Sequence, residues 1–481
     1  MLAFFIGITM TTTIGWLLLA VSEGRSPVLG RAERVAYALV FGPTAAMFVV
    51  FLCHIYGLTK LNLSGFLVPQ IVMILILGIA AWKRGAFVRG QSVALFVPKK
   101  IYPLGMTFGI ALLCVWTALK IIAGSYDLVS VPTYWDDSFN NWNMRAKMFT
   151  VTEVLTLEIP GGNGVTMSAQ GVGSYPPMVP LMKTWVSVLR GGWHEGLANG
   201  IHVVWFLGLI GVLYFTLRRF VDPLLSALGI WALVSLPLVL IHGSNPYADI
   251  VVAAHIVVAV AALLGLKKAI KRDTVLTWST LFFLSLALLV FTKNEGLVLH
   301  LPLLLLTAVA FSIRRNNLVS LADHRRAITN GFLIVATVVL PWVLFKWSEG
   351  LTFGNAKAVG EFSLAFNPHV PKAIWLHLSH QPNWLLLPLV LPLAFIAAGK
   401  KFWTSPEACI GAFVLAEISV QCLIFLFVPN LGTEAVNQTG ISRGLLHIMP
   451  VAILLLFLLL RGILKRAMLT SDGVAPIPDM R

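Results

Sequence analysis

Charged residues and cysteines are scarce in this sequence of 481 residues. Asp, Glu, Lys and Arg make up 11% of the chain, against 58% for hydrophobic residues, and the mean hydropathy is +0.86. This composition excludes a soluble globular protein and a disordered chain. The four cysteines lie in apolar runs without a CxxC pair, so neither a disulfide framework nor a thiolate metal site is predicted.

Several catalytic signatures are also missing. The sequence contains no Walker A sequence, no HExxH, no GxSxG elbow and no dinucleotide glycine fingerprint. A nucleotide-driven transporter and a hydrolase of the soluble type are therefore disfavoured. The net charge of +15 would suggest nucleic acid as a partner of a soluble protein. Here the Lys and Arg residues lie in short loops between apolar runs, so no nucleic-acid partner is expected.

Long hydrophobic runs fill most of the chain. A membrane span needs about 20 apolar residues. The sequence predicts thirteen spans, at residues 2–21, 35–59, 65–82, 101–123, 197–217, 223–243, 247–266, 275–292, 297–313, 327–347, 384–399, 406–428 and 444–460. The run at 384–399 is short and contains two prolines. The predicted fold class is therefore an all-α polytopic membrane protein that binds membrane lipids along its spans.

The distribution of positive residues predicts the orientation. Of the 35 Lys and Arg residues, 24 lie in loops 22–34, 83–100, 218–222, 267–274, 314–326 and 400–405 and in the segment after 460. Positive residues collect on the cytoplasmic side of a membrane. The N-terminus and the long loops 124–196 and 348–383 are thus predicted to lie outside. The predicted organisation is a single transmembrane domain, 1–460, and a cytoplasmic tail, 461–481.

The first long polar interruption, residues 131–149, contains the adjacent carboxylates Asp136 and Asp137. Asn141 and Arg145 follow Asp137 at helical spacing on a polar face. The apolar residues of the segment form one stripe: Trp135, Phe139, Trp142, Ala146 and Phe149. This pattern predicts an amphipathic helix in the membrane interface. One Asp could cap that helix, or the two neighbouring carboxylates could supply a general base.

Two further motifs are predicted on the exterior side, GVGSYPP at 171–177 and SNPYAD at 244–249. The Gly and Pro residues of the first motif fit a rigid structural loop, from which Tyr175 could hydrogen-bond a ligand. Asp249 opens a span, where an acidic residue is costly unless it meets water, a cation or a donor. Helix capping and convergence with Asp136 on one cavity both remain open for Asp249.

TKNEG at 292–296 and SRGLLH at 442–447 complete the exterior set. Lys293 and Glu295 could form a local salt bridge of little energetic value. Alternatively, Lys293 could meet a lipid phosphate while Glu295 orients it. Arg443 and His447 are i, i+4 neighbours. Arg443 could snorkel to the membrane surface or clamp a phosphate with its forked guanidinium.

The ordered set YWDDSFNNWNMRAK, YPP, NPYADI, TKNEG and SRGLLH resembles the GT-C superfamily of integral-membrane glycosyltransferases, which use sugars linked to polyprenyl phosphate. The resemblance covers much of residues 131–447, whereas residues 1–120 match only as hydrophobic spans. It implies a GT-C-like fold of about thirteen spans, with amphipathic interfacial helices in the first large external loop. It also implies a bacterial cytoplasmic membrane protein with its active site facing the periplasm.

The resemblance further implies an inverting transfer of a sugar from a polyprenyl-phosphate donor to a glycan, lipid or protein acceptor of the cell envelope. Asp136 matches the catalytic base, Asp137 lies beside it, and Asp249 matches a second acidic residue that assists. The usual family pattern at the first site is Asp-Glu or a lone Asp, so the Asp-Asp pair leaves open which carboxylate acts.

The remaining site residues follow from the same resemblance. Those expected to bind the donor phosphate are Lys293, Arg443 and His447. Those expected to bind substrate are Trp142, Arg145, Tyr175 and Glu295. Some family members use a divalent metal and others do not, so the metal and any other cofactor are left open.

Two alternatives compete with this reading. An O-antigen ligase or polymerase also uses lipid-linked glycans, but typically places its key residues in a large late external loop, and here the late loop 429–443 is short. A transporter of lipid-linked glycans without chemistry would need charged residues deep within its spans, where this sequence has only Lys120 and Glu417.

Overall fold

The computed structural model describes residues 1–87, 102–134, 136–159, 168–315, 321–354, 365–437 and 440–471. Within these ranges the chain forms helices and no β-strand. Ten described helices are long and apolar enough to cross a membrane. They are α1 (Leu2–Glu23), α2 (Arg31–Ile55), α3 (Leu63–Lys83), α4 (Leu104–Ser130), α7 (Glu195–Arg218), α10 (Asp249–Lys268), α11 (Arg272–Val290), α12 (Leu301–Arg314) with its preceding turn, α13 (Leu321–Ser348) and α17 (Ala408–Phe427).

Two further spans are broken. The pair α8 (Pro223–Ser235) and α9 (Pro237–Gly243) bends by 79°, and the pair α19 (Gly440–Leu446) and α20 (Met449–Ser471) bends by 49°. Counting each pair once gives up to twelve spans. The predicted run at 384–399 coincides with α16 (Leu387–Trp403), whose apolar part is shorter than a full span. The all-α polytopic fold is thus confirmed, with the predicted span at 384–399 shortened.

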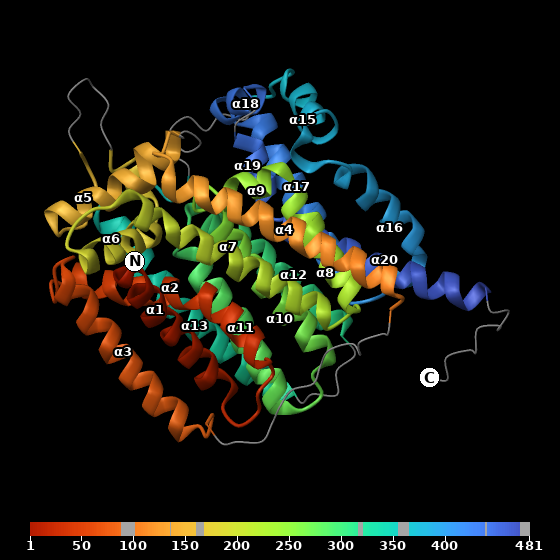
Figure 1. Ribbon diagram of the computed structural model, residues 1–481, viewed down its shortest axis with the longest axis horizontal. Helices are drawn as coiled ribbons and strands as arrows, with labels where there is room; N and C mark the ends of the chain where they lie inside the picture. The colour runs from red at the N-terminus through yellow and green to blue at the C-terminus, as the bar shows by residue number, and fades with distance from the viewer. Residues whose placement is uncertain are drawn as a thin grey trace.

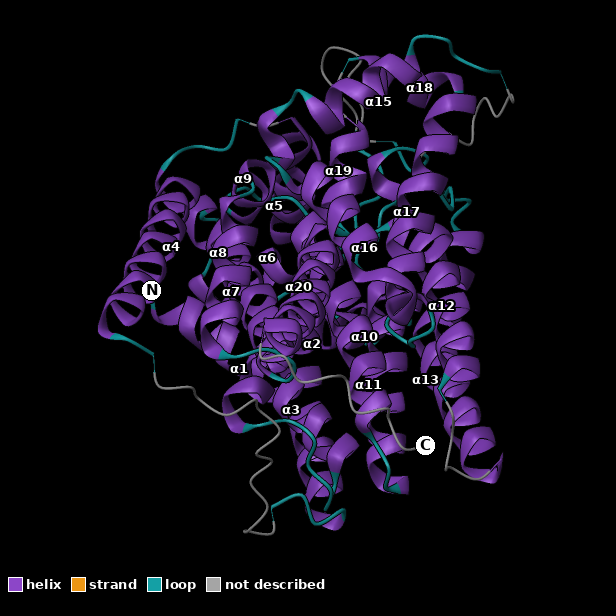
Figure 2. Cartoon of the chain, turned by 90° about the vertical axis from the view of Figure 1, so that its right-hand side faces the viewer, coloured by secondary structure: helices purple, strands orange, loops and turns teal. Residues whose placement is uncertain are grey.

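Helix α10 lies inside the bundle, whereas α3 lies at its left edge in Figure 1 and α4 lies at its left edge in Figure 2. Nearly every residue of α10 is buried, because it packs against α2, α7, α11 and α20. Its sequence is rich in Val and Ala, whose small side chains let neighbouring helices approach closely. Helix α4, by contrast, buries only Thr117 and Leu128.

The basic loops contact one another at one end of the bundle. Ser26 in the first loop donates to Asp273 beside the fourth, and the Lys268 ammonium donates to the backbone carbonyl of Arg219 at 2.6 Å. The opposite end contains the short helices α9, α15 (Val370–Ser379), α18 (Pro429–Val436) and α19, which Figure 2 shows at the top of the molecule. The gathering of positive loops at one end agrees with the charge pattern of the sequence.

The segment 131–149 is not one continuous α-helix. A π-helical stretch, η1 (Ser138–Asn143), precedes α5 (Met144–Thr152). The wider π turn rotates the preceding side chains relative to the following ones. Hence Trp142, Ala146 and Phe149 are buried as predicted, whereas Phe139 is 60% exposed and leaves the stripe. Trp135 lies outside the described residues.

Helix α20 continues to Ser471, past the predicted start of the tail at 461, and the division into a domain and a cytoplasmic tail stays a prediction. The described part of loop 124–196 begins with the end of α4 and contains η1, α5 and α6 (Met178–Arg190). Helix α6 is buried over most of its length against α1, α5 and α7. This part of the loop is therefore packed into the bundle, where it can hold a site rigidly.

Candidate functional site

Asp249, the first residue of α10, is fully buried and is the centre of a charged cluster. Its Oδ1 accepts hydrogen bonds of 2.8 Å from both the Lys293 ammonium and Nε2 of His447. Its Oδ2 lies 3.3 Å from a terminal nitrogen of Arg443 and 3.3 Å from Nδ1 of His242. Two cations thus offset the cost of burying this carboxylate. Asp249 acts here as an anchor for the groups around it.

Arg443 extends this cluster towards the surface. One of its terminal nitrogens forms an ion pair with Asp137, while the other reaches Asp249. The guanidinium lies over the ring of Tyr247, 4.8 Å from the centroid, a cation–π contact. Asp137 and Arg443 are both partly exposed, whereas Asp249 is not. The cluster therefore runs from a buried carboxylate to an accessible guanidinium.

Lys293 forms a second ion pair, with Glu295 at 3.2 Å. Burial alone would lower the pKa of Lys293, but Asp249 and Glu295 outweigh it and hold that pKa above its ordinary value of 10.5. Burial likewise raises the pKa of Glu295, but Lys293 outweighs it and the net pKa lies below 4.5. Both groups are therefore charged at neutral pH.

The two carboxylates of the adjacent pair have different surroundings. Asp136 is exposed and accepts a hydrogen bond from the side chain of Asn140. Asp137 is the residue that is paired with Arg443. Asp137, the N-cap of η1, makes no side-chain capping hydrogen bond, and the N-cap of α10 is Ala248, so Asp249 is the first helical residue and does not occupy the capping position. Helix capping thus does not account for the acidic residues at these two positions.

The YPP loop is held by buried cations. Arg145 is buried and donates from a terminal nitrogen to the Tyr175 carbonyl at 2.9 Å, and the Trp142 ring meets the Tyr175 ring edge-on. Burial lowers the pKa of Arg145 to about 9. Lys346 donates to the Ser174 carbonyl at 2.6 Å. Burial, with a smaller contribution from Glu295, raises the pKa of the Tyr175 phenol well above 10. The loop is consequently fixed beside the charged cluster.

A second polar network holds the segment that carries the acidic pair. The Thr133 hydroxyl accepts from the side-chain amides of Asn143 at 2.9 Å and Asn199 at 3.0 Å. The fully buried Lys183 donates to the side-chain oxygens of both asparagines. The Thr133 N–H donates to Glu195 at 2.6 Å. Residues on both sides of Asp136 and Asp137 are thereby tied to α6 and α7.

Sequence reasoning missed four residues that the structure brings to the cluster: His242, Tyr247, His300 and Glu417. Nδ1 of His447 lies 3.0 Å from Nε2 of His300, and Nδ1 of His300 lies 2.8 Å from Glu417 Oε1. Tyr247 lies inside the NPYADI motif, and Glu417 was visible as an acidic residue within a span. The two histidines carried no such signal, because their contacts come from helix packing.

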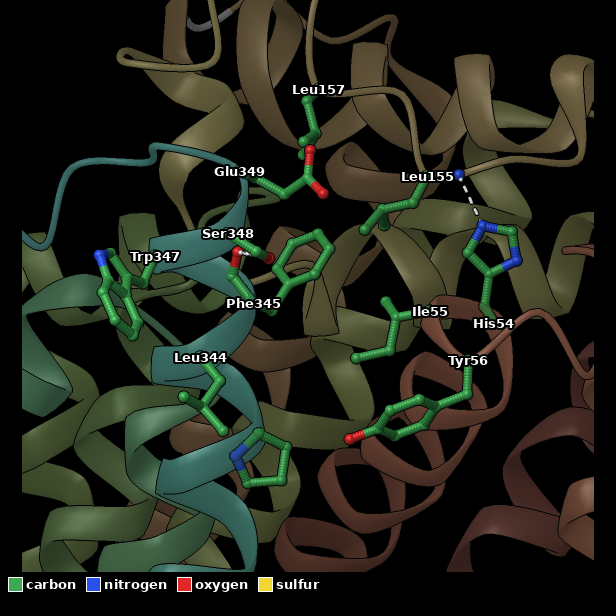
Figure 3. Close-up of a pocket in the computed structure, with 11 residues that line it drawn as sticks. His54, Ile55, Tyr56, Leu155, Leu157, Leu344, Phe345, Trp347, Ser348 and Glu349 are labelled. Atoms are coloured by element: carbon green, nitrogen blue, oxygen red, sulfur yellow. Dashed lines mark hydrogen bonds between the residues drawn. The ribbon is translucent and has the colours of Figure 1, made fainter.

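A cavity of about 780 Å³ lies near the YPP loop, between the ends of α2 and α13 (Figure 3). Its lining is His54, Ile55, Tyr56, Leu155, Leu157, Pro341, Leu344, Phe345, Trp347, Ser348 and Glu349. His54 accepts from the Leu155 N–H at 3.1 Å, as Figure 3 shows. A Cβ on Gly173 would lie 2.3 Å from the Leu157 carbonyl, so this wall touches the YPP loop. The residues of the charged cluster do not line the cavity.

The surroundings of Asp249 do not fit a divalent cation. Lys293 and Arg443 occupy its oxygens, and their positive charges would repel a metal ion. Among the described residues, no group of three or more His, Cys, Asp and Glu side chains could hold a metal ion. The charges around Asp249 suit an anion that approaches Arg443 and Lys293 from outside.

Comparison with known proteins gives a likeness of fold. No family model and no curated protein matches the sequence. The structure of ArnT from Cupriavidus metallidurans in the apo state is similar at a TM-score of 0.53 and 15% identity, covering 77% of this chain and 64% of that chain. ArnT bound to undecaprenyl phosphate gives 0.52 and 14%, covering 76% and 64%. The match thus spans less than two thirds of ArnT. The likeness shows that this chain has a GT-C-like fold, as its motifs predicted.

Proposed function

We propose that this chain is a membrane glycosyltransferase that moves a sugar from a polyprenyl-phosphate donor to an acceptor hydroxyl of a cell-envelope glycan, lipid or protein. The observation that carries the proposal is the convergence of Arg443, Lys293 and Asp249 with Asp137, which is preceded in the chain by the exposed Asp136. A similar fold binds undecaprenyl phosphate in ArnT, which supports a lipid phosphate as the ligand. The positive loops at the opposite end support an outward-facing site in a bacterial cytoplasmic membrane.

Arg443 and Lys293 are the proposed phosphate-binding residues. The Lys293 ammonium has three N–H donors, of which the ion pairs with Asp249 and Glu295 use two. Each terminal nitrogen of Arg443 carries two N–H groups, of which one faces Asp137 or Asp249 and the other is left over among the described residues. Each side chain therefore keeps a donor for a phosphate oxygen. Asp249, Asp137 and Glu295 hold the two cations in place before the donor binds.

Asp136 is the proposed general base. Its carboxylate is exposed and lies next to Asp137, which is paired with Arg443. In the proposed step, Asp136 accepts the proton of the acceptor hydroxyl while that oxygen attacks the anomeric carbon. The bond from the anomeric carbon to the phosphate oxygen breaks, and the lipid phosphate leaves with inversion. Arg443 and Lys293 stabilise the charge that develops on it.

The test compares Asp136→Asn with Asp137→Asn in a transfer assay with cellular polyprenyl-phosphate sugars. Loss of the base in Asp136→Asn is expected to lower kcat about 10²–10⁴-fold with donor binding retained. Asp137→Asn is expected to raise the donor KM, because Arg443 loses one of its two carboxylates. Asp273→Asn, at the opposite end of the bundle, is the matched control. The proposed glycosyltransferase activity would be refuted by unchanged sugar transfer in both test variants. It would also be refuted if the wild type moved intact lipid across the membrane without transferring sugar.

A further inference from the structure

Three buried side chains form a line of hydrogen bonds that leads from Asp249 into the bundle. The order is His447, His300 at the end of the π-helical turn η3 (Gly296–His300), and Glu417 in the middle of α17. The three contacts measure 2.8, 3.0 and 2.8 Å from Asp249 to Glu417. His300 and Glu417 are fully buried. The proposed transfer step uses neither of them.

The contacts fix how many protons the line contains. Asp249 accepts from Lys293 at the same Oδ1 that faces His447, so Nε2 of His447 carries a hydrogen and donates. Each of the next two contacts also needs one proton between its two atoms. The line from Asp249 to Glu417 therefore contains three protons, one for each hydrogen bond.

Three arrangements satisfy that count. In the first, both histidines are neutral and Glu417 is protonated. In the second, His300 is an imidazolium and Glu417 is ionised. In the third, His447 is the imidazolium, His300 is neutral with its proton on Nδ1, and Glu417 is ionised. Passing from the first to the third moves two protons by one hydrogen bond each and leaves the total unchanged. Positive charge appears at His447 and negative charge at Glu417.

The far end of the line is closed to proton exchange. The other oxygen of Glu417 faces the Gln421 side-chain amide at 3.5 Å, and the same nitrogen donates to the Gly444 carbonyl at 3.2 Å. An amide holds its protons and does not pass them on. A Cβ on Gly444 would lie 2.2 Å from the Gln421 side-chain oxygen, so glycine there permits this contact. Within the described residues the line of hydrogen bonds therefore ends at Glu417. Protons can shift along it and separate charge, but they cannot cross the bundle through it.

The charged groups around His447 favour the third arrangement only when an anion is present. Asp249 lies beside it, but Lys293 and Arg443 already neutralise that carboxylate, and the ring of His242 contacts Asp249 from α9. Asp137 and Glu295 also pair with these cations, so it is the burial of the His447 ring, 1% exposed, that opposes a positive charge on it in the free protein. A phosphate bound to Arg443 and Lys293 would add negative charge close to the ring and favour the imidazolium.

We propose that His300 and Glu417 form a charge relay that makes His447 positive as negative charge develops on the leaving lipid phosphate. The proposal rests on the proposed function, since it assigns these residues a part in that same transfer. One proton passes from Glu417 to Nδ1 of His300 and one passes from Nε2 of His300 to Nδ1 of His447, and no proton is exchanged with solvent. His300 and Glu417 are fully buried and act through His447.

The kinetic test uses Glu417→Gln. A glutamine at 417 donates an N–H to His300 and so preserves the first arrangement, but it cannot release a proton to the relay. We expect kcat to fall at least about tenfold with an unchanged donor KM, since only charge stabilisation in the transition state is lost. The solvent deuterium isotope effect on kcat is also expected to fall. Wild-type kcat and isotope effect in this variant would overturn the relay.

Nitrogen-15 NMR of the histidines of the detergent-solubilised full chain separates the relay from the function. Without ligand, His447 is expected to be neutral with its proton on Nε2, and a proton on Nδ1 alone would overturn the relay. Saturation with undecaprenyl phosphate is expected to convert His447 to imidazolium in the wild type but not in Glu417→Gln. If undecaprenyl phosphate does not bind, the proposed function fails, and the same shift with inorganic phosphate supports the relay. If no phosphate shifts His447, the relay is refuted.

Discussion

Arg443 joins two carboxylates that come from distant parts of the chain, Asp137 before α5 and Asp249 at the start of α10. Arg443→Lys keeps the charge but replaces a fork by a single nitrogen, which cannot hold both carboxylates and still offer an N–H to phosphate. We expect kcat to fall about 10²-fold in the transfer assay, as for loss of one oxyanion donor. Arg461→Lys, on the exposed part of α20, is the control. Equal activity of the two variants would remove Arg443 from the proposed site.

The ion pair of Lys293 and Glu295 predicts a simple pH dependence. The raised pKa of Lys293 means that its stabilising charge is fully present below pH 10.5 and is lost only as pH rises through the folded-state pKa. The lowered pKa of Glu295 means that its contribution is present above pH 4.5 and is lost as pH falls through the folded-state pKa. Both groups therefore stay charged in between.

The measurement is inhibition of transfer by undecaprenyl phosphate for the wild type and Lys293→Met between about pH 7.5 and 9.5. Lys293→Met is expected to weaken inhibition by the same factor at every pH in this range. A factor that shrinks steadily with pH would show that Lys293 loses its proton there, contrary to the ion-pair geometry.

The charged residues of the cluster could be predicted from the sequence, whereas its buried histidines His242 and His300 could not. Asp137, Asp249, Lys293 and Arg443 could be predicted because each is a charged residue in a loop or span end, where burial demands a partner. The structure brings these residues into one cluster, and their roles remain proposals. His242 and His300 could not be predicted, because a histidine near the end of an apolar helix has no distinct pattern until its neighbours are known.

The π-helical stretch η1, and helix α6 through its buried Lys183, hold the segment that contains Asp136 and Asp137. Burial lowers the pKa of Lys183 well below 10.5, although Glu195 acts in the opposite direction. The folded protein then binds fewer protons than the unfolded chain, so stability rises with pH up to about 10.5 through this group. Lys183 still satisfies the side-chain oxygens of Asn143 and Asn199, which hold Thr133.

Lys183→Met would leave those two buried oxygens without their donor, at about 1–3 kcal/mol each. We expect a lower unfolding temperature and a lower kcat, because the segment around Asp136 and Asp137 loses its support. The rise of unfolding temperature with pH should also diminish. Lys147→Met, on the exposed side of α5, is the matched control. A variant as stable and active as the control would show that the network does not position the acidic pair.

The break within helix 131–149 illustrates what periodicity misses. The apolar residues Trp142, Ala146 and Phe149 follow α-helical spacing and are buried, but Phe139, at the start of the π-helical stretch, is exposed. A pattern of 3.6 residues cannot reveal a local insertion of a wider turn. The bend between α8 and α9 had a visible signal in Pro237, which cannot continue a preceding helix without a kink.

The whole molecule predicts an orientation that labelling can test. Leu58 follows α2 and is exposed, and Ile270 lies in the basic loop between α10 and α11 and is exposed. In a variant whose four native cysteines are replaced, Leu58→Cys should react with a membrane-impermeant maleimide in intact cells. Ile270→Cys should react only after the inner membrane is permeabilised. The reverse pattern would place the proposed site in the cytoplasm.

Most spans could be predicted at this scale, since hydrophobic runs and positive loops report lipid and cytoplasm directly. The central position of α10 could not be predicted from the sequence. Helix α10 and the peripheral α4 are almost equally apolar, with mean hydropathies of 2.4 and 2.0 over their most apolar 18 residues. Hydropathy measures the free energy of transfer from water to an apolar phase, and it does not distinguish a lipid neighbour from a protein neighbour.

The enclosed position of α10 limits how this chain can diverge. A lipid-facing helix such as α4 can exchange Leu, Ile, Val and Phe freely, because lipid tails adapt to any shape. Along α10 every direction is filled by another helix, and at Gly265 a single added carbon would lie 2.4 Å from the Trp278 ring. Related sequences are therefore expected to vary most along the helices at the edge. The sequence similarity between distant relatives should be highest along α10, although this helix consists mostly of Val and Ala and contains few polar residues.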